Sequence, residues 1–300
     1  QSMMDEPHIR TLGLRMSESL GATQGSVIDY PESRYSPLVT IQTGIKGNTP
    51  LFCIPGAGAS VASFHALSQA LSEKTPLYGL QARGLDGGMV PHFDVTSAAR
   101  AYVKAVQAVQ PEGPYRLLGH SFGGWIAFEM ALQLAEQGQE VADLTIVDSN
   151  VPDEIGAPVK PINRIQTLLQ LIELYNMQLN TPLALAEDDF IRLSEDDQIS
   201  LLHAELCKAG VFHAKTPAKV LQGVIRVFEA NLATLYVPST TYKGKVRLVS
   251  PQEVSDETPE KSMKGWRQYA HDVEHLEISG NHMTMITAPH VDQLGKALNL

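Results

Sequence analysis

The sequence is poor in cysteine. Its 300 residues include only Cys53 and Cys207, and two cysteines cannot form a metal cage or a disulfide framework. Cys53 lies in the apolar run LFCIP, where a small buried thiol is expected. We therefore expect a reducing, cytoplasmic compartment, and we predict no metal site and no bound cofactor.

Concentrated positive charge is also missing. The chain has 23 Lys and Arg residues against 33 Asp and Glu residues, a formal net charge of −10. No run is rich in Lys and Arg, which argues against a nucleic-acid surface because phosphate binding needs clustered cations. No stretch approaches the roughly 18–20 uncharged residues of a membrane span, and none has the pattern of a signal peptide.

The composition is typical of an ordinary globular protein, with 43% hydrophobic and 19% charged residues. The length allows one α/β domain with a large core, or two small domains. Residues 1–37 are polar and interrupted by Gly, Pro and Ser, so we predict a linker or arm there. Residues 1–3, before Met4, resemble the scar of an expression tag, and they are left out of the fold prediction.

From residue 38 onward, apolar runs alternate with segments of helical spacing. Two strands are predicted at 38–44 and 50–56, joined by a short turn at 45–48, and further strands at 76–81, 115–119 and 143–149. Helices are predicted at 61–71, 95–110 and 122–138, the last ending at Gly138. This alternation predicts an α/β fold with a mainly parallel sheet covered by helices on both faces.

The alternation stops after Asp148. Residues 153 to about 240 show only helical patterns, with one apolar stripe at Ile165, Leu168, Leu169 and Ile172. Strand patterns return at 245–251 and 273–280, with a helix between them and another at the end of the chain. We therefore predict one domain at 38–300 with an all-helical insertion at about 153–240.

The segment Gly119-His120-Ser121-Phe122-Gly123 is the pattern G-x-S-x-G between a strand and a helix. That context is typical of a nucleophile elbow, in which a sharp turn lifts the serine hydroxyl above the sheet. Side chains two residues before and after the serine would collide, so glycine occupies both places. Gly124 leaves room for the helix to pack close to the sheet. We predict Ser121 as the nucleophile.

A serine nucleophile needs a base, and the base needs an acid that orients it. In hydrolases with this elbow the histidine comes last in the chain, and His282 follows a predicted strand near the C-terminus. His271 and His275 lie nearer the other end of that strand, and side-chain alternation turns His120 elsewhere. Four others come too early or lie in the insertion: His65, His92, His203 and His213.

The acid has three candidates. Asp148 directly ends the strand that follows the elbow helix, which makes it the tighter fit. Glu253 and Asp256 follow the later strand at 245–251, where many hydrolases of this kind carry the acid. A plain structural role for Asp148, as a cap of a turn or helix, is the competing interpretation.

The glycine-containing stretch CIPGAGAS, residues 53–60, begins within the predicted strand at 50–56 and continues past its end. Its backbone amides and that of the residue after the serine predict an oxyanion hole formed by Ala57 and Phe122. A phosphate-binding loop is the alternative, but the stretch lacks the lysine of the G-x-x-x-x-G-K-[ST] pattern.

Four stretches together resemble a known family: PLFCIPGAGASVASF, PLYGLQARGLDGG, QPEGPYRLLGHSFGGWIAFEMALQL and LTIVDS. They are similar to the thioesterase domains that end nonribosomal peptide synthetases and polyketide synthases. The resemblance runs from about Leu38 to Leu300, is weak in the helical insertion and returns at GNHMTMI. It implies an α/β-hydrolase fold, with a helical lid inserted after the sixth strand and the acid after that same strand, which favours Asp148.

The resemblance also implies an activity. Such domains take an acyl chain from the phosphopantetheine arm of a carrier protein and release it by hydrolysis or cyclisation. YGLQARGLDGG is more similar to the integrated, chain-terminating type than to the free-standing editing type. The attachment motif of a carrier is absent, so this chain is either an excised module or stands alone.

Several alternatives stay open at this point. A free-standing editing thioesterase or a carboxylester hydrolase would use the same residues, and a non-catalytic binding protein would have the same fold. The apolar stripes of the insertion either pack on the core and on each other or line an acyl pocket. Met283 and Met285 either border that pocket or belong to the core.

Overall fold

A computed structural model describes residues 35–153, 163–253 and 258–298. The chain divides into two units, Gln1–Tyr35 and Ser36–Leu300. The predicted arm at residues 1–37 therefore lies almost entirely outside the described residues. No helix in the described part of the chain is long and apolar enough to cross a membrane.

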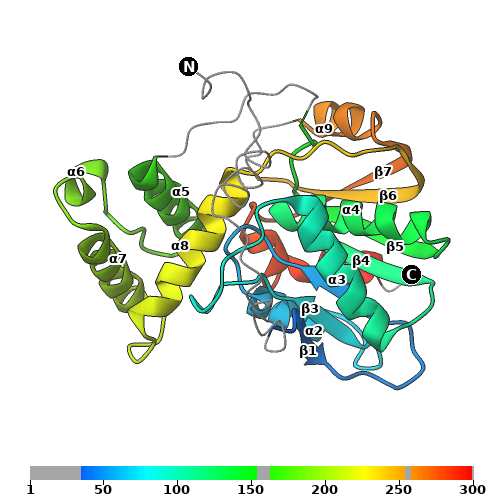
Figure 1. The fold of residues 1–300 in the computed structure, drawn as a ribbon, viewed down its shortest axis with the longest axis horizontal. Helices are drawn as coiled ribbons and strands as arrows, with labels where there is room; N and C mark the ends of the chain where they lie inside the picture. The colour runs from blue at the N-terminus through cyan, green and yellow to red at the C-terminus, as the bar shows by residue number, and fades with distance from the viewer. Residues whose placement is uncertain (1–34, 154–162, 254–257, 299–300) are drawn as a thin grey trace, which may run out of the picture. The chain divides into compact units, whose positions relative to one another are not determined.

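The second unit is built on a seven-stranded sheet (Figure 1). Its strands are β1 Leu38–Gln42, β2 Leu51–Ile54, β3 Leu77–Leu80, β4 Tyr115–His120, β5 Val141–Val147, β6 Tyr242–Pro251 and β7 Ala270–Ile278. They lie in the order β1-β3-β2-β4-β5-β6-β7, and every neighbouring pair is parallel except β1 with β3. The predicted mainly parallel α/β fold is confirmed.

The expected link between the first two strands needs a correction. We predicted two strands joined by a short turn, but β3 lies between β1 and β2 and pairs with both. All four residues of β2 are buried, whereas β1 is half exposed. A strand buried on both faces belongs in the middle of a sheet, and a half-exposed antiparallel strand suits its edge.

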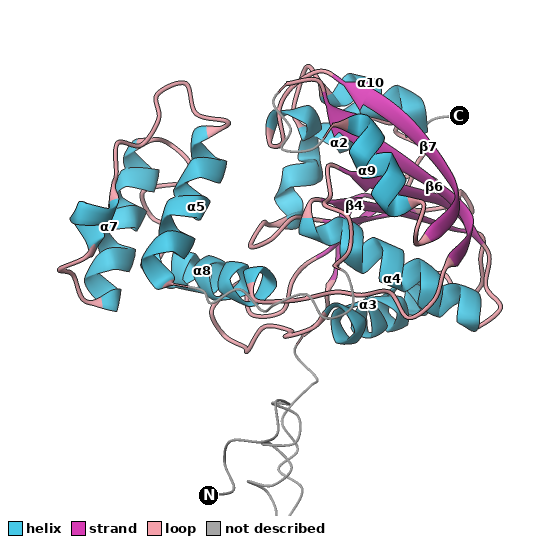
Figure 2. Ribbon diagram, turned by 90° about the horizontal axis from the view of Figure 1, so that it is seen from above, coloured by secondary structure: helices cyan, strands magenta, loops and turns pink. Residues whose placement is uncertain are grey.

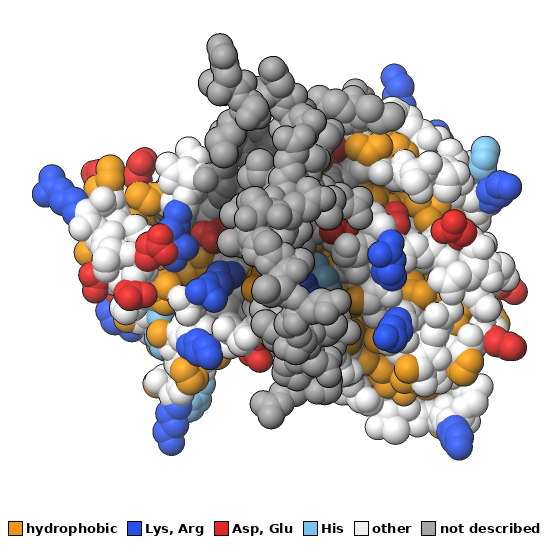
Figure 3. All heavy atoms as spheres, viewed as in Figure 1, with side chains coloured by type: hydrophobic (Ala, Val, Ile, Leu, Met, Phe, Trp, Pro, Cys, Tyr) orange, Lys and Arg blue, Asp and Glu red, His pale blue; other side chains and the backbone are white. Residues whose placement is uncertain are grey.

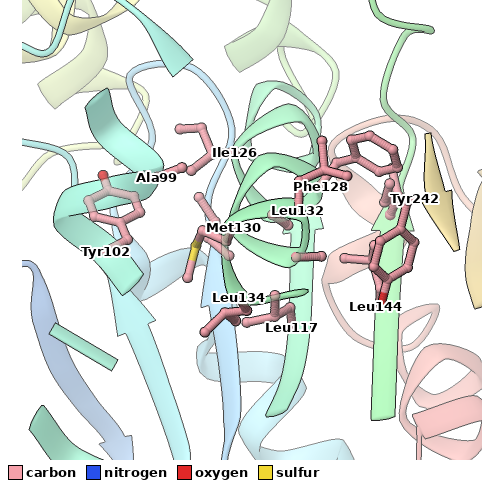
Figure 4. Close-up of a cluster of buried hydrophobic side chains, with 14 of the residues drawn as sticks. Ala99, Tyr102, Leu117, Ile126, Phe128, Met130, Leu132, Leu134, Leu144 and Tyr242 are labelled. Carbon is pink, nitrogen blue, oxygen red and sulfur yellow. The ribbon is translucent and has the colours of Figure 1, made fainter. Parts of the chain in front are cut away.

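Helices cover both faces of the sheet (Figure 2). They are α2 His65–Ala70, α3 Val95–Val109, α4 Phe122–Glu136, α9 Pro259–Trp266 and α10 Val291–Leu298, with short 3₁₀ turns at Val61–Phe64 and Thr284–Ile286. Side chains of α3, α4 and α9 form one buried cluster with the sheet, and side chains of α2 and α10 form another on the opposite face. Figure 4 shows the first cluster, in which Met130 of α4 lies toward Tyr102 of α3 and Phe128 lies on the other side of α4, beside Tyr242 of β6.

Four more helices follow β5: α5 Arg164–Asn176, α6 Glu187–Phe190, α7 Glu195–Lys208 and α8 Ala218–Leu232. Both ribbon views show them beside the sheet rather than on its faces (Figures 1 and 2). They follow the fifth strand of the described residues, not a sixth as the family resemblance implied. We call these four helices the lid.

The lid has a buried cluster of its own. Leu168 and Ile172 of the predicted stripe are buried in it, and Ile165 and Leu169 are partly buried against it. Because the stripe faces the other lid helices, its main role is packing within the lid. Charged side chains cover the outer surface of the lid at the left of Figure 3.

The two ends of the lid meet at its base. The amide of Asp153 donates to the carbonyl of Tyr236 at 2.8 Å, and the amide of Tyr236 donates to the carboxylate of Asp153 at 2.9 Å. The Tyr236 hydroxyl donates to the buried Glu129 of α4 at 2.7 Å. The lid is therefore attached next to the helix that begins at the predicted nucleophile.

Candidate active site

The predicted nucleophile, Ser121, has a strained backbone between β4 and α4. Its φ is 55° and its ψ is −129°, a conformation that residues with side chains rarely adopt. Among the described residues only one other non-glycine residue, Asp148, has a positive φ, at 44°. Strain of this kind collects at functional sites, and here it falls on the predicted nucleophile and acid.

The glycines of the motif make room for neighbouring backbone. A Cβ on Gly119 would overlap the carbonyl oxygen of Gly123, and a Cβ on Gly123 would overlap the carbonyl oxygen of Ile54. Gly119 therefore permits the sharp turn, and Gly123 lets α4 approach the loop that follows β2. In that loop, a Cβ on Gly56 would lie 3.1 Å from Cβ of Ser121 and 3.5 Å from its Oγ. The loop backbone thus lies directly beside the nucleophile.

The end of β5 and the residues just after it hold the Ser121 backbone. The amide of Ser121 donates to the carbonyl of Val147 at 2.8 Å, and the hydroxyl of Ser149 donates to the carbonyl oxygen of Ser121. Gly124 leaves the space for that hydroxyl, because a Cβ at position 124 would overlap Ser149 Oγ. The strand that carries the predicted acid therefore also supports the strained turn.

Asp148 and His282 are joined by a short hydrogen bond. Asp148 is the first residue after β5, and its amide donates to the carbonyl of Val249 at 2.8 Å. Nδ1 of His282 donates to Oδ2 of Asp148 at 2.6 Å, with the two side chains 22% and 19% exposed. This bond places the ring hydrogen on Nδ1 and leaves the lone pair of Nε2 free to accept a proton.

Neither Glu253 nor Asp256, the other two candidate acids, has a described hydrogen bond between its carboxylate and His282. Glu253 lies after β6, and its amide donates to the carbonyl of Gly280 at 3.1 Å, two residues before His282. Asp256 lies outside the described residues. Of the described candidates, Asp148 is the one whose carboxylate is hydrogen-bonded to His282.

Other histidines considered from the sequence have other surroundings. His203 lies in the lid, with Nε2 3.7 Å from Sγ of Cys207. His275 lies within β7, with Nε2 3.1 Å from Oγ of Ser250. The rest lie at the start of α2, before α3, after α7 and in β7: His65, His92, His213 and His271.

A hydrogen bond between Ser121 Oγ and the His282 ring is not among those of the described residues. Catalytic hydrogen bonds are often long or poorly aligned before a substrate binds. The two residues are nevertheless close, because the carbonyl of His282 accepts a 2.9 Å hydrogen bond from the ring of His120, the residue before Ser121. The structure thus brings Ser121, Asp148 and His282 to the same edge of the sheet.

The predicted oxyanion donors flank the nucleophile. Phe122 is the first residue of α4, and the first amides of a helix have no partner within it. Ala57 follows Gly56 in the loop after β2 and is partly buried against the lid cluster. Both amides belong to the segments that meet at Ser121, and their role as donors stays a prediction.

The lid contacts both loops of the site. A Cβ on Gly58 would lie 3.0 Å from Cβ of Phe228 on α8, so α8 packs directly on the loop after β2. On the other side, Nδ2 of Asn281 donates to the carbonyl of Met177 at the end of α5, at 3.0 Å. Asn281 precedes His282, and its Oδ1 accepts from the amide of Thr284 at 2.9 Å. The histidine loop is therefore tied directly to the lid.

The methionines after His282 have different surroundings. Met285 is fully buried in the cluster with α2 and α10, so it belongs to the core. Met283 is partly buried. Cys53 is fully buried as expected, and burial raises the pKa of its thiol, which makes it inert. The described residues contain no group of three or more His, Cys, Asp or Glu side chains that could hold a metal ion.

Sequence reasoning missed three residues of the site: His120, Ser149 and Asn281. The expectation that alternation turns His120 elsewhere left out its contact with the base, since its ring centroid lies 4.9 Å from that of His282. The loop after β7 brings the main chain of His282 within hydrogen-bond distance of the His120 ring. The sequence offered one signal for these three residues: each is the direct neighbour in the chain of Ser121, Asp148 or His282.

The family comparison decides the class of this fold. The sequence model described as "Thioesterase domain" matches residues 49–299. The chain belongs to the thioesterase domain family. The resemblance seen in the sequence is confirmed, and the family assigns the domain to the hydrolases.

Relatives of this thioesterase domain are large synthetases. Aspulvinone E synthetase melA of Aspergillus terreus is 33% identical over 184 residues, which cover 60% of this chain and 19% of the synthetase. The chain spans only 2%, 14% and 19% of the first curated relatives that it matches. The thioesterase domain therefore corresponds to a small part of each of these proteins.

Solved structures share its fold. The four-domain nonribosomal peptide synthetase holo-AB3403 matches with a TM-score of 0.78 at 22% identity, over 88% of this chain and 20% of that one. The NocB thioesterase domain, solved as a covalent complex with a fluorophosphonate nocardicin G analogue, matches with a TM-score of 0.63 at 23% identity, over 88% and 98% of the two chains. At these identities the likeness shows the α/β-hydrolase fold alone.

Proposed function

We propose that this domain is a serine thioesterase that releases an acyl, peptidyl or polyketide chain from the phosphopantetheine arm of a carrier protein, through an acyl-Ser121 intermediate. The observation that carries the proposal is the 2.6 Å hydrogen bond between His282 and Asp148, formed beside a serine held in a strained elbow. Two residues with strained backbone and an oriented imidazole cost conformational free energy, and a purely structural role does not require that cost.

In the first step, Ser121 Oγ attacks the carbonyl carbon of the thioester while Nε2 of His282 takes the hydroxyl proton. Asp148 keeps the ring in the tautomer that can accept this proton and stabilises the resulting imidazolium. The carbon–sulfur bond then breaks, the proton passes from His282 to the departing thiolate, and the acyl group remains as an ester on Ser121.

The developing oxyanion is held by the amides of Ala57 and Phe122. Loss of one such donor typically costs about 2.7–4 kcal/mol of transition-state stabilisation. The packing of α8 on the loop after β2 fixes the position of the first amide, and the helix start fixes the second. This positioning lets both donors act without reorganisation during the reaction.

The second step regenerates the enzyme. Water, or a nucleophile on the acyl chain itself, attacks the ester carbonyl while His282 accepts its proton, and Ser121 leaves with that proton returned. Water gives an acid, and an internal nucleophile gives a ring. The relatives named as synthetases support a carrier-bound substrate, with the carrier either upstream in the same protein or on a separate chain.

The two cysteines bear on the compartment. Cys53 and Cys207 are both free, as they would be in a reducing compartment. We therefore place the activity in the cytoplasm.

The experiment is covalent labelling by a fluorophosphonate. The wild-type domain should be labelled once, and Ser121→Ala should abolish the label. The matched control is Ser279→Ala, because Ser279 also pairs with a histidine, at 2.8 Å from Nδ1 of His290, and this variant should label like the wild type. Undiminished labelling of the Ser121→Ala variant refutes the proposal.

The substrate class is tested separately. The domain should turn over acyl-carrier thioesters much faster than simple esters of the same acyl group. Equal or faster turnover of the esters would instead identify a carboxylester hydrolase. Labelling without turnover of any acyl substrate would favour a binding role.

A further inference from the structure

One buried imidazole next to the nucleophile has no part in the chemistry described so far. His120 is the last residue of β4, directly before Ser121, and it is 3% exposed. A buried polar ring in such a position needs a hydrogen-bond partner. That partner is the catalytic loop itself.

The contact joins two segments that are distant in the chain. Nε2 of His120 donates to the main-chain carbonyl of His282 at 2.9 Å, across 162 positions in the sequence. The two rings lie 4.9 Å apart between centroids, with their planes tilted by 34°. Because a carbonyl only accepts, the hydrogen must be on Nε2 of His120, and Nδ1 carries a lone pair.

The same ring touches the third segment of the site. A Cβ on Gly56 would lie 3.5 Å from Nδ1 of His120. The ring therefore fills the space among the loop after β2, the elbow and the histidine loop. These three segments carry the predicted oxyanion donors, the nucleophile and the base.

The ring is neutral under ordinary conditions. Burial and, after it, the neighbouring His282 lower the pKa of His120 from 6.5 to about 3, against the opposing influence of the hydrogen bond and of Asp148. A neutral ring in a fixed tautomer keeps its one donor available over the whole working range of a hydrolase. It also adds no positive charge that would compete with the imidazolium formed on His282.

Other contacts shape the histidine loop and orient its ring. Oδ1 of Asn281 accepts from the amides of Met283 and Thr284 at 3.0 and 2.9 Å, which shapes the turn. The Asp148 carboxylate orients the ring of His282. Among the described residues, the hydrogen bond from His120 links the main chain of His282 directly to β4, the strand before the nucleophile.

We propose that His120 is a positioning residue, which fixes the distance between His282 and Ser121 by donating a hydrogen bond to the main-chain carbonyl of His282. This inference rests on the proposed function, in which His282 is the base. A base displaced by about 1 Å can cost up to about a hundredfold in rate. The contact therefore acts on kcat, while the binding of the acyl chain is unaffected.

Three substitutions separate the hydrogen bond from the packing. In His120→Gln the side-chain amide nitrogen lies roughly where Nε2 of the imidazole lies, so the donor is kept. In His120→Asn the amide is one carbon shorter and does not reach the carbonyl. His120→Leu fills the space without any donor. We expect His120→Gln to stay within a few-fold of the wild-type kcat, and His120→Asn and His120→Leu to lose about ten- to a hundredfold.

The measurements are kcat and KM with an acyl-pantetheine thioester, together with thermal unfolding of each variant. KM should change less than kcat. A purely structural role would lower the melting temperature and leave the kcat of the folded protein unchanged. Either that result, or an equal loss in His120→Gln and His120→Leu, overturns the proposal.

Nitrogen NMR of the wild-type protein labelled with ¹⁵N-histidine requires no variant to fold. One neutral ring protonated at Nε2, with no titration between about pH 5 and pH 9, is expected for His120. An Nδ1-protonated or titrating ring at this position overturns the proposal. Failure of the proposed function can be told apart from failure of this inference. If the proposed function is wrong, Ser121→Ala keeps its fluorophosphonate label, independently of any result with the His120 variants.

Discussion

Oδ2 of Asp148 lies 2.6 Å from Nδ1 of His282, although 134 positions separate the two residues in the chain. The acid stands at the end of β5 and the histidine in the loop after β7, with β6 between these strands. The loop after β7 therefore reaches across the carboxyl end of β6 to meet the acid. This geometry distinguishes Asp148 from the carboxylates that follow β6 itself.

Replacing Asp148 by Asn should nearly abolish turnover. The amide can present a hydrogen to Nδ1 and so favour the wrong ring tautomer, and we expect kcat to fall on the order of 10³- to 10⁴-fold. The control is Glu253→Gln, which should keep wild-type kcat. A large loss in Glu253→Gln with little loss in Asp148→Asn would reassign the acid.

Ser149→Ala should weaken the elbow without touching the substrate. The hydroxyl of Ser149 donates to the carbonyl of Ser121, and its loss should reduce the free energy of unfolding by about 1 kcal/mol. We expect kcat to fall about tenfold, with KM nearly constant. Ser250→Ala is the control, because Ser250 is near Nε2 of His275 instead, and an equal fall in its kcat would contradict this role.

Two variants of Asn281 should separate the turn from the lid contact. Ser at this position can still accept from the amides two and three residues later, but it cannot reach Met177. In Asn281→Ser, amide hydrogen exchange should therefore become about two- to tenfold faster at the end of α5 only. In Asn281→Ala, exchange should become faster both at the end of α5 and in the loop at 281–287. Unchanged exchange at the end of α5 in both variants would show that the contact with Met177 does not stabilise the lid.

The stability of the domain should fall as the pH decreases below about 6.5. Burial lowers the pKa of His92 to about 4 and that of His120 to about 3, both from 6.5. Above pH 6.5 these rings are neutral in both states and cause no pH dependence. Below it, the unfolded chain binds protons that the folded domain does not, so the free energy of unfolding falls by up to about 1.4 kcal/mol per pH unit for the buried His120.

Urea unfolding at about pH 7 and about pH 5 measures this slope. The window avoids Glu274, whose pKa is lowered mainly by the hydrogen bond from Lys245 and then by Arg247, and whose stabilisation is lost only at lower pH. His92→Gln should flatten the slope, and substitution of the exposed His65 by Gln should not. An unchanged slope in His92→Gln would mean that the folded domain accommodates a charged ring at this position.

The sequence alone determined the parallel sheet, the elbow at Ser121 and the family. Alternating strand and helix patterns specify βαβ units through local periodicity, and glycine at 119 and 123 is a local steric requirement that no other residue meets. It also proposed His282 and Asp148, but it left Glu253 and Asp256 open, because a carboxylate after a strand looks the same wherever that strand lies in the sheet.

Only the tertiary structure decided the strand order and the contacts across it. The position of β1 beside β3, the bond between Asp148 and His282, and the burial of His120 beneath the histidine loop all join residues far apart in the chain. Such contacts depend on the order of the strands and on the path of each loop across the sheet edge. Neither the strand order nor the path of a loop is encoded in the local periodicity of the sequence. The partner of a side chain could therefore be known only from the assembled sheet.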